Sequence, residues 1–231
     1  MMRPKLISSF FSRVVFISLL LMASIQSSAQ ERPKILDVGK DTIPFLRGVS
    51  VSADLVGLIQ KAVGDYGQYE ASLRVNIKDK YFPVVELGFG KADAADDATR
   101  LTYKTSAPYG RIGLDFNMMK NKHDDYRIYA GFRYAFTTFK YDVTSMGIED
   151  PVWREHTDFG IEGAKCTYHW GELVVGIDAK ILGPFRMGWT VRYRRRIAHS
   201  ESDFGNAWYV PGFGKGDGSK LGGTFNLTFE L

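Results

Sequence analysis

The side chains most suited to catalysis stand together in the run His199-Ser200-Glu201-Ser202-Asp203. A histidine, a serine and an acid are the groups from which a hydrolase builds a base-activated nucleophile. Such a site needs side chains held in a fixed relation to one another, whereas these are adjacent residues in a polar stretch. We therefore interpret the run as a polar loop and expect a protein that is not an enzyme, with no catalytic residue.

The histidines and the single cysteine do not have metal-ligand spacing. His123, His156, His169 and His199 are far apart, and Cys166 has no second thiol to join it. Zinc sites pair their ligands at short, regular spacings. The sequence therefore predicts no metal site and no bound cofactor.

A glycine-rich run, 212–218, resembles a phosphate-binding loop only superficially. It lacks the Gly-Lys-Ser/Thr ending and a helix after it. Its composition predicts a flexible, exposed loop with turn chemistry.

The N-terminal residues 1–29 have the order of a secretory signal peptide. Arg3, Lys5 and Arg13 come first, an apolar run 14–22 follows, and small residues lead to a predicted cleavage after Ala29. The run is shorter than the roughly 20 residues that a membrane helix needs. No later stretch approaches that length, so strands would have to do any spanning.

Removing the leader takes three of the 30 basic residues and leaves a chain nearly balanced against 26 acidic ones. This balance argues against a nucleic-acid partner. Residues 30–47 lack periodicity and are interpreted as a short periplasmic lead-in, and residues 48–231 as the folded domain.

The folded domain carries eight segments in which apolar residues alternate with small or polar ones, the pattern of β-strands. They cover residues 49–55, 69–77, 81–91, 111–116, 128–136, 172–181, 187–194 and 221–231. Tight turns at 78–80 and 182–184 contrast with long connections at 91–107, 141–165 and 198–220. Short turns on one side and long loops on the other are typical of outer-membrane barrels. We predict an all-β fold, an eight-stranded antiparallel up-and-down transmembrane β-barrel in a bacterial outer membrane.

A secreted soluble barrel would show the same alternation, and the polar face separates the two interpretations. A lumen of eight strands is just wide enough to be filled by side chains. Here the polar face is charged with both signs, which predicts ion pairs across the lumen among Glu70, Arg74, Glu86, Arg111, Asp115, Arg133, Glu172, Asp178, Lys180, Arg192 and Arg194.

Aromatic residues make up 14% of the chain and gather near the predicted strand ends. We expect interfacial girdles formed by Tyr81, Phe82, Tyr109, Phe136, Phe139, Tyr168, Trp170, Trp189 and Phe229. In the basic run 192–196, alternation turns Arg192, Arg194 and Arg196 inward and Arg195 outward near the outer end of its strand. There Arg195 would be placed to contact lipopolysaccharide phosphate.

The leader, the eight strands and the ending Gly222-Gly223-Thr224-Phe225-Asn226-Leu227-Thr228-Phe229-Glu230-Leu231 resemble the small eight-stranded outer-membrane barrels. The ending also resembles the signal read by the barrel-assembly machinery, although that pattern usually closes on an aromatic residue and this chain closes on Leu231. More narrowly, the mature chain resembles a Bacteroidota barrel family catalogued as a domain of unknown function, with relatives that accompany the assembly machinery. The resemblance brings no catalytic residues.

These observations predict a structural or protein-interaction role, as an accessory subunit of a larger outer-membrane complex such as the barrel-assembly machinery. The expected partners are outer-membrane lipid, lipopolysaccharide and other envelope proteins. Two alternatives remain open. One is a lipid A acyltransferase or deacylase, because some small barrels carry His, Ser and acidic residues at the outer rim, and the other is a narrow pore.

Overall fold

A computed structural model describes residues 44–96, 100–145, 147–149, 156–157, 160–200, 207–215 and 218–231. The predicted signal peptide, 1–29, and most of the lead-in, 30–47, lie outside these ranges. In the described part of the chain no helix is long and apolar enough to cross a membrane.

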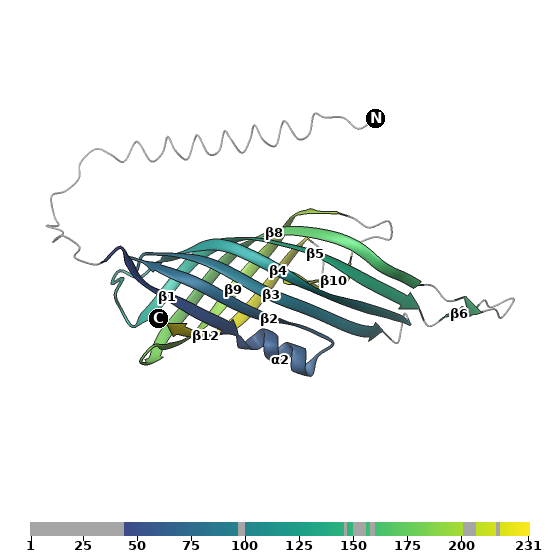
Figure 1. The fold of residues 1–231 in the computed structure, drawn as a ribbon, viewed down its shortest axis with the longest axis horizontal. Helices are drawn as coiled ribbons and strands as arrows, with labels where there is room; N and C mark the ends of the chain where they lie inside the picture. The colour runs from purple at the N-terminus through teal and green to yellow at the C-terminus, as the bar shows by residue number, and fades with distance from the viewer. Residues whose placement is uncertain are drawn as a thin grey trace, which may run out of the picture. The chain divides into compact units, whose positions relative to one another are not determined.

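Eight long antiparallel strands form a sheet that closes on itself as a barrel (Figure 1). Each of them pairs with the next one along the chain, and β1 and β12 close the ring from Ser50↔Glu230 to Asp54↔Asn226. The prediction of an all-β fold with eight antiparallel strands is confirmed. The strands are β1 (Leu46–Asp54), β2 (Tyr66–Ile77), β3 (Tyr81–Asp96), β4 (Leu101–Asn117), β5 (Tyr126–Ser145), β8 (Gly160–Leu182), β9 (Phe185–His199) and β12 (Ser219–Glu230).

Two short hairpins lie in the connections between barrel strands. β6 (Ile148–Glu149) pairs with β7 (His156–Thr157), and β10 (Tyr209–Val210) pairs with β11 (Gly214–Lys215). The tight turns lie at the other end of the barrel from these hairpins, at the predicted positions 78–80 and 182–184. Lys78 and Asp79 both have positive φ angles, 54° and 55°, which is the backbone of a two-residue hairpin turn.

Several strands are longer than their alternation predicted, and the expected long loop at 91–107 is wrong. β3 runs on to Asp96 and β4 begins at Leu101, so most of that stretch is a hairpin. β5 and β8 extend in the same way. In these extensions the outward side chains are polar, for example Lys104 and Lys140, while aromatic side chains point inward. The polarity of the two faces is inverted there. A strand predicted from its apolar face therefore ends before the real strand does.

A helix, α2 (Leu55–Val63), follows β1 directly and was not predicted. Asp54 caps it, because its carboxylate accepts hydrogen bonds from the backbone N–H groups of Val56 and Gly57 at 3.0 and 3.1 Å. The helix leaves Ile59 63% exposed and Val63 85% exposed, so it carries apolar surface on its outer side.

The barrel is apolar outside and charged inside over the part of each strand nearest the tight turns. Leu87, Ile112, Phe132, Leu173 and Val191 point outward and are each more than half exposed. Their sequence neighbours Glu86, Arg111, Arg133, Glu172 and Arg192 are buried in the interior.

The predicted aromatic girdles are correct for only part of the set. Tyr81, Phe136, Trp189 and Phe229 are exposed on the outer face, whereas the other five side chains are buried. The reason is register, because each of the five occupies a position of inward parity on its strand. These five are Phe82, Tyr109, Phe139, Tyr168 and Trp170.

Four of these buried aromatic side chains belong to an apolar cluster inside the loop end of the barrel, whereas Phe82 lines the cavity at the tight-turn end. Trp170, Phe139 and Tyr168 come from the extended strands, and Tyr209 and Phe213 come from the β10–β11 hairpin. The interior therefore has two zones, with charged side chains toward the tight turns and aromatic ones toward the long loops.

Candidate functional site

The interior charges form one network, built from the inward positions of six neighbouring strands. Because side chains alternate along a strand, residues two apart face the same lumen. On its inward face β9 thus carries Arg186, Arg192 and Arg194, and β4 carries Arg111 and Asp115. The opposing carboxylates come from β2, β3, β4 and β8.

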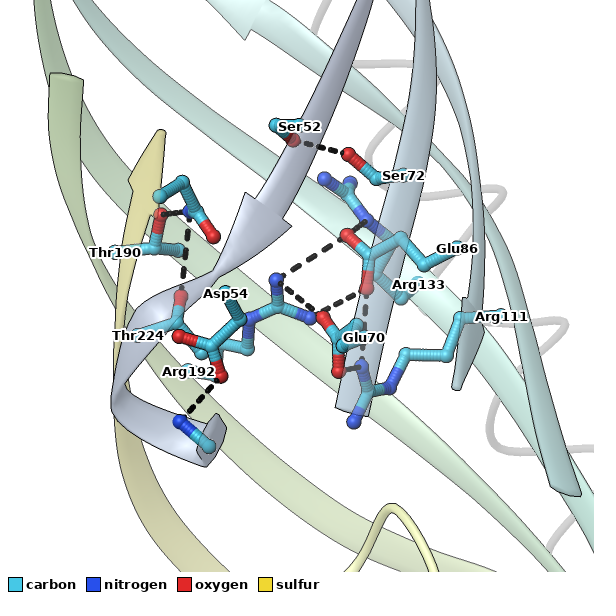
Figure 2. Close-up of polar contacts among 12 residues, drawn as sticks. Ser52, Asp54, Glu70, Ser72, Glu86, Arg111, Arg133, Thr190, Arg192 and Thr224 are labelled. Carbon is cyan, nitrogen blue, oxygen red and sulfur yellow. Dashed lines mark hydrogen bonds and ion pairs between the residues drawn. The ribbon is translucent and has the colours of Figure 1, made fainter. Parts of the chain in front are cut away.

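Glu86 on β3 lies at the centre of the network (Figure 2). Its Oε2 accepts from Arg192 Nη1 at 2.5 Å and from Arg111 Nη1 at 3.1 Å. Its Oε1 accepts from Arg133 Nε at 3.1 Å. Three guanidinium groups from β4, β5 and β9 therefore converge on one buried carboxylate.

Glu70 and Glu172 complete the layer around Glu86. Glu70 pairs with Arg111 and lies 3.3 Å from Arg192, and the Tyr109 hydroxyl donates to it at 2.7 Å. Glu172 lies 2.9 Å from Arg111 Nε, and Trp170 Nε1 donates to it at 2.7 Å.

A second layer lies nearer the tight turns. Arg133 donates two hydrogen bonds to Asp115, at 2.7 and 2.9 Å, in the bidentate geometry that suits a guanidinium and a carboxylate. Arg74 bridges Asp115 and Asp178 at 3.2 and 3.4 Å. Arg186 closes this layer at 2.6 Å from Asp178.

The β10–β11 hairpin plugs the loop end and bonds directly to the network. Arg111 Nη2 donates to the Gly212 carbonyl at 2.8 Å, and Arg194 Nη1 donates to the Phe213 carbonyl at 2.9 Å. Tyr103 holds the same hairpin through the Tyr209 carbonyl at 2.7 Å. Burial raises the pKa of Tyr209 to about 12. The plug thus supplies neutral acceptors to two arginines.

The interpretation of 212–218 as an exposed loop is therefore wrong for the part that the structure describes. Gly212 is buried with a φ of 81°, and Phe213 is fully buried against Trp170. Gly212 leaves room for the Tyr109 ring, which would lie 2.6 Å from a Cβ placed there. The available signal was the apolar stretch Tyr209 to Phe213 inside an otherwise polar connection.

Ten of the eleven residues predicted for the lumen lie in this network, and Lys180 does not. Lys180 is exposed and lines a cavity of about 300 Å³ at the tight-turn end. Arg186 belongs to the network but was not predicted. Extending the alternation back from Gly188 would have placed it on the inward face. Arg195 is exposed on the outer face, in register with Gly171 and Ser219.

Side chains fill the lumen almost completely at the level of the two charged layers. The space left between the two charged layers, lined by Ser52, Glu70, Glu86, Arg192 and Thr228 among others, has a volume of about 10 Å³. That is about the room for one water molecule.

A separate polar clasp joins the tight-turn ends of the strands. Asp79 pairs with Arg47 at the start of β1 and with His123 Nδ1 at 2.7 Å, and Asn76 Nδ2 donates to it at 2.6 Å. Burial of the Asp79 carboxylate opposes ionisation, but the hydrogen bonds from His123 and Asn76 and the Arg47 charge outweigh it and lower the pKa. The clasp ties β1 to two turns.

The run 199–203 is described only at its first two residues. His199 contacts the Tyr168 ring, and Ser200 Oγ accepts from the backbone N–H of Thr167 at 2.8 Å. Glu201, Ser202 and Asp203 lie outside the described residues. Within the described ranges no cluster of His, Cys, Asp or Glu is arranged to hold a metal ion.

Fold and interior together define a closed eight-stranded barrel with a charged and plugged lumen. The chain belongs to the family described as Domain of unknown function (DUF6048), whose model matches residues 7–230. This confirms the expected membership of a family of unknown function. No curated protein matches the chain. It is similar to a major outer membrane protein from Thermus thermophilus, with 12% identity and a TM-score of 0.40 over 80% of this chain and 98% of that one.

The central place of Glu86 makes a testable prediction about stability. Glu86→Gln leaves three buried guanidinium groups without their shared charge, and breaking a buried ion pair from one side costs about 3–5 kcal/mol. Asp93→Asn is the matched control, because Asp93 pairs with Lys104 at 3.7 Å with both side chains more than half exposed, and it should cost below about 1 kcal/mol. Urea unfolding of each variant in lipid vesicles measures both, and equal losses would contradict a central role for Glu86.

Proposed function

We propose that this protein is a sealed transmembrane barrel of a bacterial outer membrane, with a structural or protein-interaction role rather than a catalytic or conducting one. The observation that carries the proposal is the division of the barrel surface. Large apolar side chains are exposed outside, while charged ones are paired inside. A water-soluble barrel would place these two sets the other way round.

The outer face also changes polarity at a consistent level. Outward positions turn from apolar to polar between Phe89 and Lys91 on β3, and between Phe136 and Thr138 on β5. On β9 the change falls between Tyr193 and Arg195, with Ile197 as one exposed apolar side chain beyond it. Between this level and the tight turns, each of these apolar runs has about the 9 to 11 residues that a tilted strand needs to cross a bilayer. The level would then be the outer headgroup region, where Arg195 would meet lipopolysaccharide phosphate.

The sealed lumen favours the interaction role over a narrow pore. Conduction needs a continuous water path, and the two charged layers and the plug leave almost no free volume. The role as an accessory subunit of a complex such as the barrel-assembly machinery, and an origin in Bacteroidota, rest on the resemblance of the sequence. The alternative of lipid A chemistry has no observation in its favour among the described residues.

If the barrel is inserted in a membrane, the free-energy cost of a charged side chain on its outer face should rise with the depth of that side chain in the bilayer. Leu173→Arg places a cation in the middle of the apolar belt and should cost about 2–4 kcal/mol in lipid vesicles. Thr138→Arg, on the polar side of the boundary, should cost below about 1 kcal/mol. The readout is the free energy of unfolding in urea with vesicles present. A soluble barrel would tolerate both changes alike, which would overturn the proposal.

A sealed lumen predicts that the purified barrel does not conduct. Incorporated into planar bilayers in concentrated potassium chloride, the wild-type protein should give no stable single-channel current. The control is the same preparation shown by heat-dependent gel migration to be folded. Regular current steps from the folded protein would favour the narrow pore instead.

The interaction role predicts a defined complex. Purification from native membranes in mild detergent should recover other envelope proteins in fixed ratio with the barrel. The control is a harsh detergent that releases the barrel alone. A barrel that elutes as a lone species from the mild preparation would argue against the accessory role.

A further inference from the structure

The seam between β1 and β12 is incomplete toward the long loops. β1 ends at Asp54, whereas β12 continues to Ser219, so Ser219 to Phe225 has ladder pairing only with β9. The Asp54 carboxylate partly replaces the missing strand, since it accepts from the Phe225 N–H at 3.3 Å. Above that contact the wall contains a cleft of about 270 Å³.

The cleft is lined by two cationic side chains, Arg194 and Lys220, by the Asp54 carboxylate, and by uncharged residues of which several are glycines. Arg194 reaches the β12 wall from inside, and a Cβ at Gly222 would lie 3.3 Å from its Nη2. Lys220 lines the cleft, and its Nζ donates to the Lys215 carbonyl at 2.7 Å. Lys215 itself lies over the Trp208 ring at 3.9 Å. Two cationic side chains therefore line this break in the barrel wall, and a third, the Lys215 ammonium, lies 4.3 Å from the centre of the Tyr66 ring, which also lines the cleft.

The carboxylates near the cleft are already engaged elsewhere. Asp54 holds three backbone N–H groups, and Glu172 lies 3.4 Å from Arg194 Nε but also pairs with Arg111. Within the described residues neither Lys215 nor Lys220 has a carboxylate at ion-pair distance. A cluster of this charge favours an anion with several acceptor oxygens, and phosphate meets that requirement.

The surroundings of the cleft are apolar on the outside. Leu221 is 68% exposed beside its mouth, and α2, which lies next to β12, exposes Ile59 and Val63. An amphipathic helix with such a face fits the boundary between headgroups and acyl chains. The cleft also lies at the level where Leu221 gives way to the polar Ser219, which matches the change of polarity on the other strands.

We propose that this cleft binds the phosphate of an anionic lipid of the outer leaflet, with Arg194 and Lys220 on the phosphate and the acyl chains against Leu221 and α2. The proposal rests on the membrane location proposed above. Nothing else in the described surface combines a broken seam, converging cations and an apolar approach. The cleft is separate from Arg195, which points outward from β9.

Native mass spectrometry of the protein in phosphatidylcholine nanodiscs with added phosphatidylglycerol tests the proposal. The wild-type barrel should retain phosphatidylglycerol in preference to phosphatidylcholine. Lys220→Gln and Lys215→Gln should each reduce this enrichment about fivefold. Lys140→Gln, an exposed lysine on β5 away from the cleft, is the matched control and should leave it unchanged.

A second variant keeps the charges and narrows the mouth. Gly223→Leu adds a side chain where the nearest atom to a Cβ is 3.8 Å away, and it should also reduce phosphatidylglycerol retention. Equal enrichment in all variants, or equal loss in the Lys140 control, overturns the cleft as the site. Displacement of the lipid by inorganic phosphate alone would show an anion site that needs no lipid, and would overturn the proposal too. A protein that fails to enter nanodiscs at all contradicts the membrane location instead.

Discussion

The structure depends on the pairing of buried carboxylates with buried arginines inside a closed sheet. Removing a charge from water costs several kcal/mol, and the cost is recovered only where partners and hydrogen bonds are in place. Glu86 meets this condition with three guanidinium groups, and Asp115 with a bidentate arginine. Because the partners come from different strands, the network acts across the lumen and favours one register for the whole ring.

The plug follows from the same requirement. Arg111 and Arg194 keep N–H groups that their ion pairs with Glu70, Glu86 and Glu172 do not occupy, and these N–H groups need neutral acceptors. The carbonyls of Gly212 and Phe213 supply them, and the hairpin buries its aromatic side chains against Trp170 and Tyr168. The loop end is thereby closed by apolar packing, while the part nearer the turns is closed by ion pairs.

The sequence was sufficient for the barrel and for most of its interior, because alternation has a period of two in every strand. A position such as Arg133 or Glu172 can have only one of two orientations, and its apolar neighbours decide which. The strand extensions were missed because their polarity inverts beyond Phe89 and Phe136. The helix α2 and the plug were missed because a short connection is too short to show a periodic pattern. The contact of Gly212 with Tyr109 joins residues far apart in the sequence and cannot be seen in a local pattern.

The central claim is that the outward side chains face lipid and the inward ones face a sealed interior. Spin labels on single cysteines along β8, from 173 to 181, in a Cys166→Ser background, test it most directly. The account predicts that labels at outward positions such as Val175 relax with lipid-soluble oxygen and are protected from a water-soluble nickel chelate. Labels at outward positions that respond mainly to the nickel chelate would contradict it.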